Sequence, residues 1–197
     1  MSHPELSILI PAAGCSKRLG QPKQLVQYKS GTLIQNAVHH AYSIAPLEII
    51  VVTGANAKAV ENAVHQTTVR WIHNPHWPTG MGGSIAVGAA AISPAASGVM
   101  ILLCDQWRLQ ATDLQKLAQT WQSGHDRIIC ARADGQNMPP VIFPACLFRR
   151  LQALDKDSGA RTILEENPGI LTPVPLKNAG FDLDTKAHFD QLKMCEL

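Results

Sequence analysis

Short apolar segments rich in β-branched residues alternate with helical patterns along the chain, and this alternation constrains the fold more than any other feature. The apolar segments are nearly continuous, as strands covered on both faces are. Amphipathic stripes at 33–41 and 114–121 lie between them. The sequence therefore predicts an α/β protein, with a mostly parallel central sheet and helices on both faces. The expected strands are Leu6–Ile10, Glu48–Val52, Val69–Ile72, Val99–Leu103, Arg127–Ala131 and Val141–Phe143. The second stripe is expected to open at Thr112, with Gln115 completing a capping box, and to close at Gly124.

Length and composition indicate one globular domain, residues 1–197, since no linker or internal repeat interrupts the chain. Hydrophobic residues make up 46% and charged residues 16%, which excludes a disordered protein. A net charge of +2 gives no large basic field, so no nucleic-acid partner is expected. No apolar run approaches the roughly 20 residues that span a bilayer, and no signal-peptide pattern opens the chain, so no membrane association is expected.

The cysteines and histidines do not form a metal or disulfide pattern. The odd number of cysteines, without C-x-x-C spacing, predicts reduced thiols and a cytoplasmic protein. The eight histidines include no H-E-x-x-H, and no G-x-S-x-G nucleophile motif is present. The cysteines are Cys15, Cys104, Cys130, Cys146 and Cys195.

The segment PAAGCSKRLGQPKQL, residues 11–25, follows the first expected strand and carries the strongest functional signal. Its small residues let backbone N–H groups approach a bulky anion, and Arg18 and Lys23 add cations within the same loop. It is not a P-loop, because no Gly-Lys-Ser/Thr follows, and Ser16 stands where a dinucleotide fingerprint needs glycine. We interpret it as a phosphate site, against the alternative of an ordinary strand–helix loop with two solvated basic side chains. The small residues of the loop are Ala12, Ala13 and Gly14.

Three carboxylates are candidate metal ligands. Asp105 ends the apolar run VMILLCD, and ligands of open α/β sheets bind at the carboxyl ends of strands. An acidic group beside a phosphate loop is unfavourable unless a divalent cation lies between them, so we expect Asp105 to bind Mg²⁺, the alternative being a capping or turn aspartate. Asp182 and Asp184 would share one face of an extended segment and repel each other without a cation. Thr185 resembles a helix N-cap, so Asp184 could instead merely start the last helix, and the sequence does not separate the two aspartates as second ligand.

Two glycine-containing segments are candidate substrate contacts. Residues 74–91 form a glycine-rich loop that enters a helix of small residues, which also suits tight helix packing. Residues 155–161 place Ser158 at a helix start and Arg161 in its first turn, where they could bind the acceptor's phosphate or simply cap the helix. The nucleotide-binding candidates in the first segment are Asn74, Gly82 and Ser84.

Taken together, these motifs resemble those of the molybdenum cofactor cytidylyltransferase group of the MobA-like nucleotidyltransferase A family, over nearly the whole chain. The resemblance rests on PAAGCSKRLGQPKQL, NPHWPTGMGGSIAVG, LLCDQW, PPVIF, DSGAR and DLDT, in that order, with Leu19 replacing the usual methionine. It implies a Rossmann-like three-layer sandwich, Mg²⁺, and transfer of a nucleotide's α-phosphoryl group to an acceptor phosphate with release of pyrophosphate. It also implies that Arg18 and Lys23 act on the nucleotide phosphates and that Asp105 binds the metal, with Asp182 or Asp184 as the second ligand. The residues that it implies at the nucleotide are Pro11, Ala12, Ala13 and Gly14.

The chain departs from the family pattern on the acceptor side. Trp107 stands where proline is usual, and Met138-Pro139-Pro140 replaces Gly-His-Pro, so we expect a reshaped acceptor rim. Ala13 fits a cytidylyl-type loop and favours CTP over GTP. The leading hypothesis is CMP transfer from CTP to a molybdopterin-type cofactor, whose product a molybdenum hydroxylase could receive. The alternatives are transfer to an isoprenoid or sugar phosphate, and a non-catalytic molybdopterin carrier.

Overall fold

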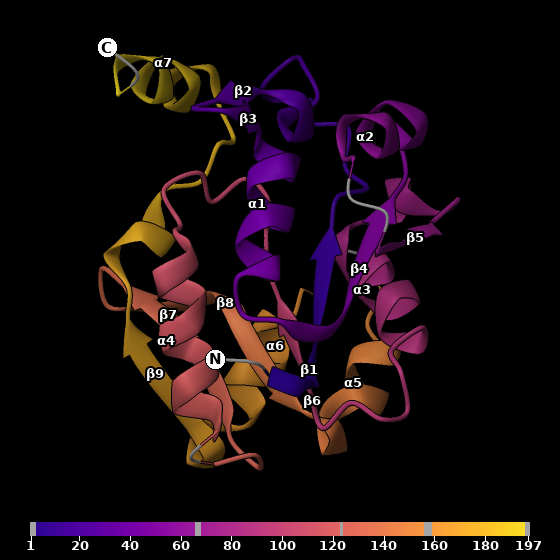
Figure 1. The fold of residues 1–197 in the computed structure, drawn as a ribbon, viewed down its shortest axis with the longest axis vertical. Helices are drawn as coiled ribbons and strands as arrows, with labels where there is room; N and C mark the ends of the chain where they lie inside the picture. Colours follow the sequence, from indigo (N-terminus) through magenta and orange to yellow (C-terminus); the bar gives the residue numbers. More distant parts are fainter. Residues whose placement is uncertain (1–2, 66–67, 123, 156–158, 196–197) are drawn as a thin grey trace.

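A seven-stranded sheet forms the centre of the computed structural model, which describes residues 3–65, 68–122, 124–155 and 159–195 (Figure 1). The strand order is β5-β4-β1-β6-β8-β7-β9, and every neighbouring pair is parallel except the two that β8 makes. The mostly parallel sheet predicted from the sequence is therefore confirmed. The strands are β1 (His3–Pro11), β4 (Pro46–Thr53), β5 (Val69–His73), β6 (Gly98–Ile101), β7 (Ile128–Ala133), β8 (Gln136–Pro144) and β9 (Leu171–Pro175).

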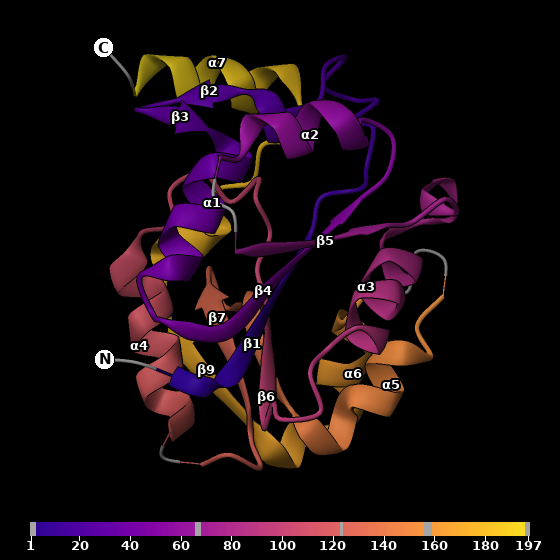
Figure 2. The same ribbon diagram turned by 45° about the vertical axis from the view of Figure 1, so that its right-hand side comes forward.

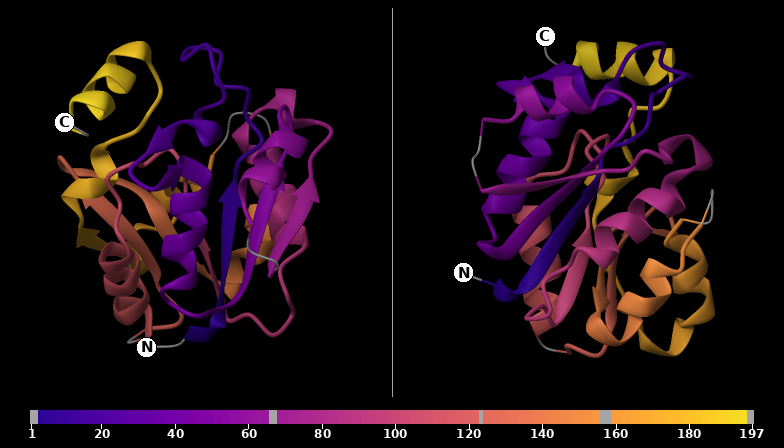
Figure 3. Two further views of the ribbon diagram at one scale, coloured as in Figure 1. Left: turned by 45° about the horizontal axis from the view of Figure 1, so that its top comes forward. Right: turned by 90° about the vertical axis from the view of Figure 1, so that its right-hand side faces the viewer.

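Helices cover both faces of the sheet and complete the expected three layers (Figures 2 and 3). Alternate residues of β1 point to opposite faces, so Ile8 packs in the cluster with α1, α2 and α4 while Leu9 packs against α3. None of the described helices is long and apolar enough to cross a membrane. The helices are α1 (Leu33–Tyr42), α2 (Ala57–Ala63), α3 (Met81–Ala90), α4 (Ala111–Gln122), α5 (Phe148–Gln152), α6 (Arg161–Glu166) and α7 (Lys186–Met194). Short 3₁₀ turns are η1 (Lys23–Leu25), η2 (Trp77–Thr79), η3 (Ala145–Leu147), η4 (Pro168–Ile170) and η5 (Lys177–Gly180).

The N-terminus of α4 differs from the expectation. The helix begins at Ala111, and the Asp113 carboxylate accepts a hydrogen bond of 2.9 Å from the Gln110 backbone N–H. A carboxylate in the third helical position is a stronger acceptor than a hydroxyl, so the predicted capping box of Thr112 and Gln115 is wrong. A capping box does form at α1, between Thr32 and Gln35.

A small upper layer lies over the carboxyl edge of the sheet. The hairpin of β2 (Gln27–Tyr28) and β3 (Gly31–Thr32) meets α7 there, although they come from opposite ends of the chain (Figure 1). Trp107 is 4% exposed in this layer, with its ring centroid 5.2 Å from that of Tyr28. The Trp107 indole therefore packs inside this layer. The expectation that Trp107 and Met138-Pro139-Pro140 reshape the acceptor rim stays a prediction. The upper core consists of Val26, Tyr28, Leu33, Trp107, Leu183 and Leu192.

Gly98 on β6 permits the close approach of α4. A Cβ added there would lie 2.5 Å from Cζ2 of the buried Trp121 indole, which is a rigid group. We expect Gly98→Ala to lower the free energy of unfolding by about 1–3 kcal/mol, measured by urea denaturation. Gly169→Ala is the matched control, since no heavy atom lies within 4 Å of its added Cβ. Equal urea midpoints for the two variants would contradict this account of the packing.

Candidate active site

A cluster of opposite charges lies at the carboxyl edge of the sheet. Lys23 in η1 donates a hydrogen bond from Nζ to Oδ2 of Asp105, which follows β6, and its Nζ lies 3.1 Å from Oδ1 of Asp184. Nη2 of Arg18 lies 3.1 Å from the other oxygen, Oδ2, of Asp184. The structure therefore brings together the two cations and two of the three carboxylates that the sequence singled out, from segments more than 150 residues apart.

Burial and charge together fix the protonation of this cluster. The Lys23 and Asp105 side chains are 19% and 8% exposed. Burial alone would lower the pKa of Lys23, but the charges of Asp105 and Asp184 outweigh it and hold that pKa well above its usual value. Burial likewise opposes ionisation of Asp184, yet Lys23 and Arg18 keep its pKa below the ordinary range. Both Lys23 and Asp184 are thus charged at neutral pH.

Two carboxylate oxygens in the cluster lack partners. Oδ1 of Asp105 and Oδ1 of Asp182 are buried and accept no hydrogen bond from any described residue. The two residues are adjacent in space, because the Leu183 N–H donates to the Asp105 carbonyl at 3.0 Å and Asp182 forms a β-bridge with Gln106. Burial, with the charges of Asp105 and Asp184 adding to it, raises the pKa of Asp182 to about 7.

This donor set fits a divalent cation. Magnesium takes oxygen ligands and is commonly held by one or two carboxylates together with substrate phosphates, and the unpartnered oxygens of Asp105 and Asp182 are of that kind. No group of three or more His, Cys, Asp or Glu side chains in the described part of the chain could hold a metal by itself.

A cavity of about 340 Å³ opens beside the charged cluster. The loop after β1 forms one wall and the start of α3 forms another. Among the nucleotide-binding candidates, those on its surface are Pro11, Ala13, Gly14 and Ser84. Arg18, Lys23, Asp105 and Asp184 also line it. The volume is in the range of small-molecule pockets, so a nucleotide-sized ligand can enter beside the cations.

The other three nucleotide-binding candidates lie behind the cavity wall. Ala12 is buried, and its N–H donates to the Val52 carbonyl at 2.8 Å. Asn74 is buried and donates from Nδ2 to Ser84 Oγ at 3.0 Å, so it orients a residue that does reach the cavity. Gly82 is buried in the first turn of α3. These residues position the surface of the cavity and do not form it.

Gln24, which was not predicted from the sequence, holds the loop after β1 in shape. Its carboxamide nitrogen donates to the carbonyls of Ala12 at 2.9 Å and Gly14 at 2.7 Å, and the side chain is 1% exposed. A carboxamide supplies the two N–H donors that converging carbonyls need. Gln24 belongs to the Pro-Lys-Gln motif of the loop, which could have drawn attention to it. Nothing in the sequence showed which carbonyls its amide would reach.

We expect Gln24→Glu to weaken nucleoside triphosphate binding about tenfold or more, because the new side chain would face two carbonyls without donors. Titration calorimetry with the triphosphate measures this effect. Gln27→Glu makes the same change at an exposed position on β2 and should leave the affinity unchanged. Equal affinities for the two variants would show that the loop does not depend on Gln24.

Trp77 is a second residue of the site that was not predicted from the sequence. It lines the cavity from η2, and a Cβ added to Gly54 would lie 2.6 Å from its Cβ and 2.7 Å from the Ala13 carbonyl oxygen. Only glycine at position 54 allows the indole and the phosphate loop to meet this closely. The part of the cavity wall that η2 forms is thereby fixed.

The structure describes only one of the two residues, Ser158 and Arg161, that were predicted to bind the acceptor. Ser158 lies outside the described residues. Arg161 is exposed on α6, does not line the cavity, and donates from Nε to Oε1 of Glu165 at 2.9 Å. Its role at an acceptor phosphate stays a prediction.

Comparison with known proteins identifies the family. The profile of the MobA-like NTP transferase domain matches residues 8–170. The chain is 30% identical over 188 residues to the molybdenum cofactor cytidylyltransferase of Escherichia coli K12, covering 93% of each chain. It is also 30% identical over 185 residues to the nicotine blue oxidoreductase of Paenarthrobacter nicotinovorans, covering 88% of this chain and 89% of that one.

Solved structures show the same fold. Rv0371c of Mycobacterium tuberculosis superposes with a TM-score of 0.83 at 24% identity, covering 95% of this chain and 97% of that one. Its complex with manganese gives a TM-score of 0.81 at 21% identity, with the same coverage. The resemblance found in the sequence motifs is confirmed: this chain belongs to the MobA-like NTP transferase domain family.

Proposed function

We propose that the protein transfers CMP from CTP to the phosphate of a molybdopterin-type cofactor and releases pyrophosphate. The observation that carries the proposal is the pairing of Lys23 with Asp105 beside a nucleotide-sized cavity, with an unpartnered oxygen on Asp105 and on the neighbouring Asp182. Cations for phosphates and oxygens for a metal are the two requirements of nucleotidyl transfer. The cytidylyltransferase relative from E. coli supports the choice of nucleotide and acceptor.

The reaction is an exchange of phosphorus–oxygen bonds. An oxygen of the acceptor phosphate attacks the α-phosphorus of CTP, the bond from that phosphorus to the α,β-bridging oxygen breaks, and pyrophosphate leaves with the electron pair. Arg18 and Lys23 bind the triphosphate oxygens and neutralise the charge that builds on the leaving group. The hydrogen bonds from Gln24 to the Ala12 and Gly14 carbonyls hold the neighbouring N–H groups in place for this purpose.

Asp105 and Asp182 are the proposed ligands of Mg²⁺, and Asp184 is assigned a different role. Both oxygens of Asp184 are already engaged, one by Lys23 and the other by Arg18, whereas Asp182 keeps a buried free oxygen. The metal, when bound, neutralises charge on the phosphates during transfer. Asp184 orients the two cations.

The proposal is tested by pyrophosphate release with each nucleoside triphosphate, with and without molybdopterin. We expect molybdopterin-dependent release with CTP above that with GTP at equal concentrations, because Ala13 lines the cavity, backed by the buried Ala12, and the two leave a compact site for the base. Ala13→Gly should relax the preference without abolishing turnover. A preference for GTP in the unmodified protein would overturn the base assignment and leave the transfer chemistry intact.

The same assay separates the alternatives. Release with an isoprenoid or sugar phosphate but not with molybdopterin would reassign the acceptor, and molybdopterin binding without release would indicate a carrier. The relative from P. nicotinovorans is named a nicotine blue oxidoreductase, so oxidoreductase activity on nicotine blue is measured in parallel. The described cysteines are all unpaired, which supports the proposed cytoplasmic setting.

A further inference from the structure

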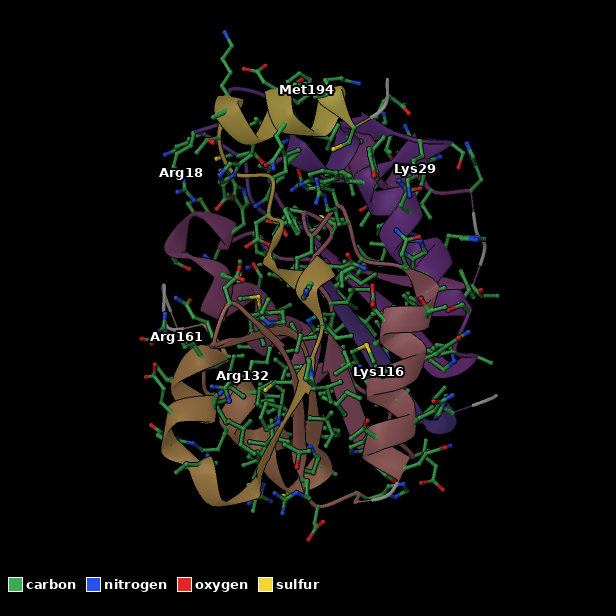
Figure 4. All side chains as sticks on the ribbon, turned by 90° about the vertical axis from the view of Figure 1, so that its left-hand side faces the viewer. Arg18, Lys29, Lys116, Arg132, Arg161 and Met194 are labelled. Atoms are coloured by element: carbon green, nitrogen blue, oxygen red, sulfur yellow. The ribbon has the colours of Figure 1, made fainter. Side chains whose placement is uncertain are left out.

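An arginine on β7 has no partner, in contrast to the cations of the active site. The guanidinium of Arg132 is exposed and makes no hydrogen bond or ion pair with any described residue, whereas Arg18 and Lys23 are neutralised by Asp184 and Asp105. Arg161 is also engaged, through Glu165. In Figure 4, Arg132 lies on the same side of the molecule as Arg18 and Arg161. Arg132 is therefore an exposed, unpaired cation that lies outside the cavity lining, on the same side of the molecule as Arg18.

Asn137 lies directly across the strand pair from Arg132. The two residues are register partners in the antiparallel ladder of β7 and β8, so their side chains leave the same face of the sheet. Oδ1 of Asn137 is buried and accepts no hydrogen bond from the described part of the protein. A carboxamide can donate to a phosphate oxygen and accept from a hydroxyl or N–H group. The pair thus places the positive charge of Arg132 beside the hydrogen-bond donor and the acceptor of the Asn137 carboxamide.

This pair is tied to the metal-binding carboxylates through Gln106. The residue follows Asp105 directly, and its Nε2 donates to the carbonyls of Pro139 and Ala179, each at 2.7 Å. Pro139 is two residues along β8 from Asn137, a separation of about 7 Å in a strand. The hydrogen bond from Gln106 to Pro139 therefore attaches β8, the strand that carries Asn137, to the residue that follows Asp105.

We propose that Arg132 and Asn137 bind the phosphate monoester of the acceptor, an inference that rests on the proposed function. Arg132 pairs with the phosphate, and Asn137 contacts the phosphate and a hydroxyl or N–H group next to it on the acceptor. The nearby Asp134 does not compete for Arg132, since no ion pair joins them and its Oδ2 lies 3.5 Å from the position of a Gly180 Cβ. The nucleotide's phosphates and the acceptor's phosphate then have separate cations, which limits binding of the acceptor at Arg18 and Lys23.

The site is tested first by binding, without any turnover. Glycerol 3-phosphate is titrated into ¹⁵N-labelled protein while the side-chain signals of Arg132 Nε–H and Asn137 Nδ2–H are followed by NMR. We expect saturable shifts at both, none with glycerol, and loss of the Asn137 shift in Arg132→Gln. The control Arg149→Gln removes another exposed arginine, on α5, and should leave the titration unchanged. Absence of a saturable shift at Arg132 and Asn137 would overturn the inference.

A second measurement connects the site to the reaction. In the pyrophosphate assay with CTP and molybdopterin, Arg132→Gln should raise the acceptor KM about tenfold or more, as expected for loss of a charge-assisted hydrogen bond, while the CTP Kd stays unchanged. An unchanged acceptor KM would overturn the inference. If the unmodified protein released no pyrophosphate with any triphosphate and acceptor, the proposed function would fail, and the NMR titration would still decide whether this phosphate site exists.

Discussion

Replacing Asp105 with asparagine should reduce turnover about 100-fold or more and leave the protein folded. The substitution keeps the shape of the side chain but removes its negative charge, on which both the pairing with Lys23 and the binding of a cation at the buried Oδ1 depend. Pyrophosphate release at saturating CTP and molybdopterin measures the effect, and circular dichroism with urea denaturation checks the fold. Adding Mg²⁺ should not restore the rate, because the missing charge belongs to the protein.

The matched control for this experiment is Asp126→Asn, which removes a carboxylate from an exposed loop after α4. Its turnover should equal that of the unmodified protein. If Asp105→Asn also kept turnover within a few-fold, Asp105 would be neither a metal ligand nor a part of the charge cluster on which transfer depends.

Lys23→Ala should weaken triphosphate binding and slow transfer about 100-fold or more, because ground-state and developing charge both lie on the phosphates. The change also leaves Asp105 and Asp184 facing the incoming anion without the cation between them. Titration calorimetry measures the affinity, with Lys58→Ala on the exposed side of α2 as control. Unchanged affinity in Lys23→Ala would show that the loop does not bind the phosphates.

The raised pKa of Lys23 determines the pH range over which this prediction holds. Because the folded-state pKa is raised above the ordinary value, the charge is present at all lower pH and is lost only as the pH rises through the raised pKa. The difference in triphosphate affinity between the unmodified protein and Lys23→Ala should therefore stay constant between about pH 6 and 9. A difference that disappeared within that range would contradict the ion pairs described for Lys23.

The sequence was sufficient to predict the carboxyl edge of the sheet and the residues that meet there. Parallel strands all end at one edge, so the loop after β1 and Asp105 after β6 had to be neighbours. The sequence did not separate Asp182 from Asp184, because the spacing argument assumes an extended strand through both. Only Asp182 pairs, with Gln106, and the chain then turns to the Thr185 cap, which places the two carboxylates in different surroundings.

Packing decided the features that the sequence did not show. β9 was missed because Pro173 and Pro175 interrupt its pattern, and an edge strand tolerates prolines that a central strand would not. Trp107 follows Gln106 at the active-site edge, yet it is buried against Tyr28 and Phe181. Its surroundings come from the β2–β3 hairpin and from the chain after residue 180, and no local pattern reports contacts between segments so far apart.

The upper core has a consequence for the order in which the protein is assembled on the ribosome. Val26 and Tyr28 emerge early, but the core that they share with Trp107 is completed by Leu183 and Leu192, and Asp184 lies between these two leucines. The sheet can form from residues made before position 176, whereas Arg18 and Lys23 lack their Asp184 partner until position 184 has been added. The growing chain thus passes through a stage in which the sheet is complete and the charged cluster at its carboxyl edge is not.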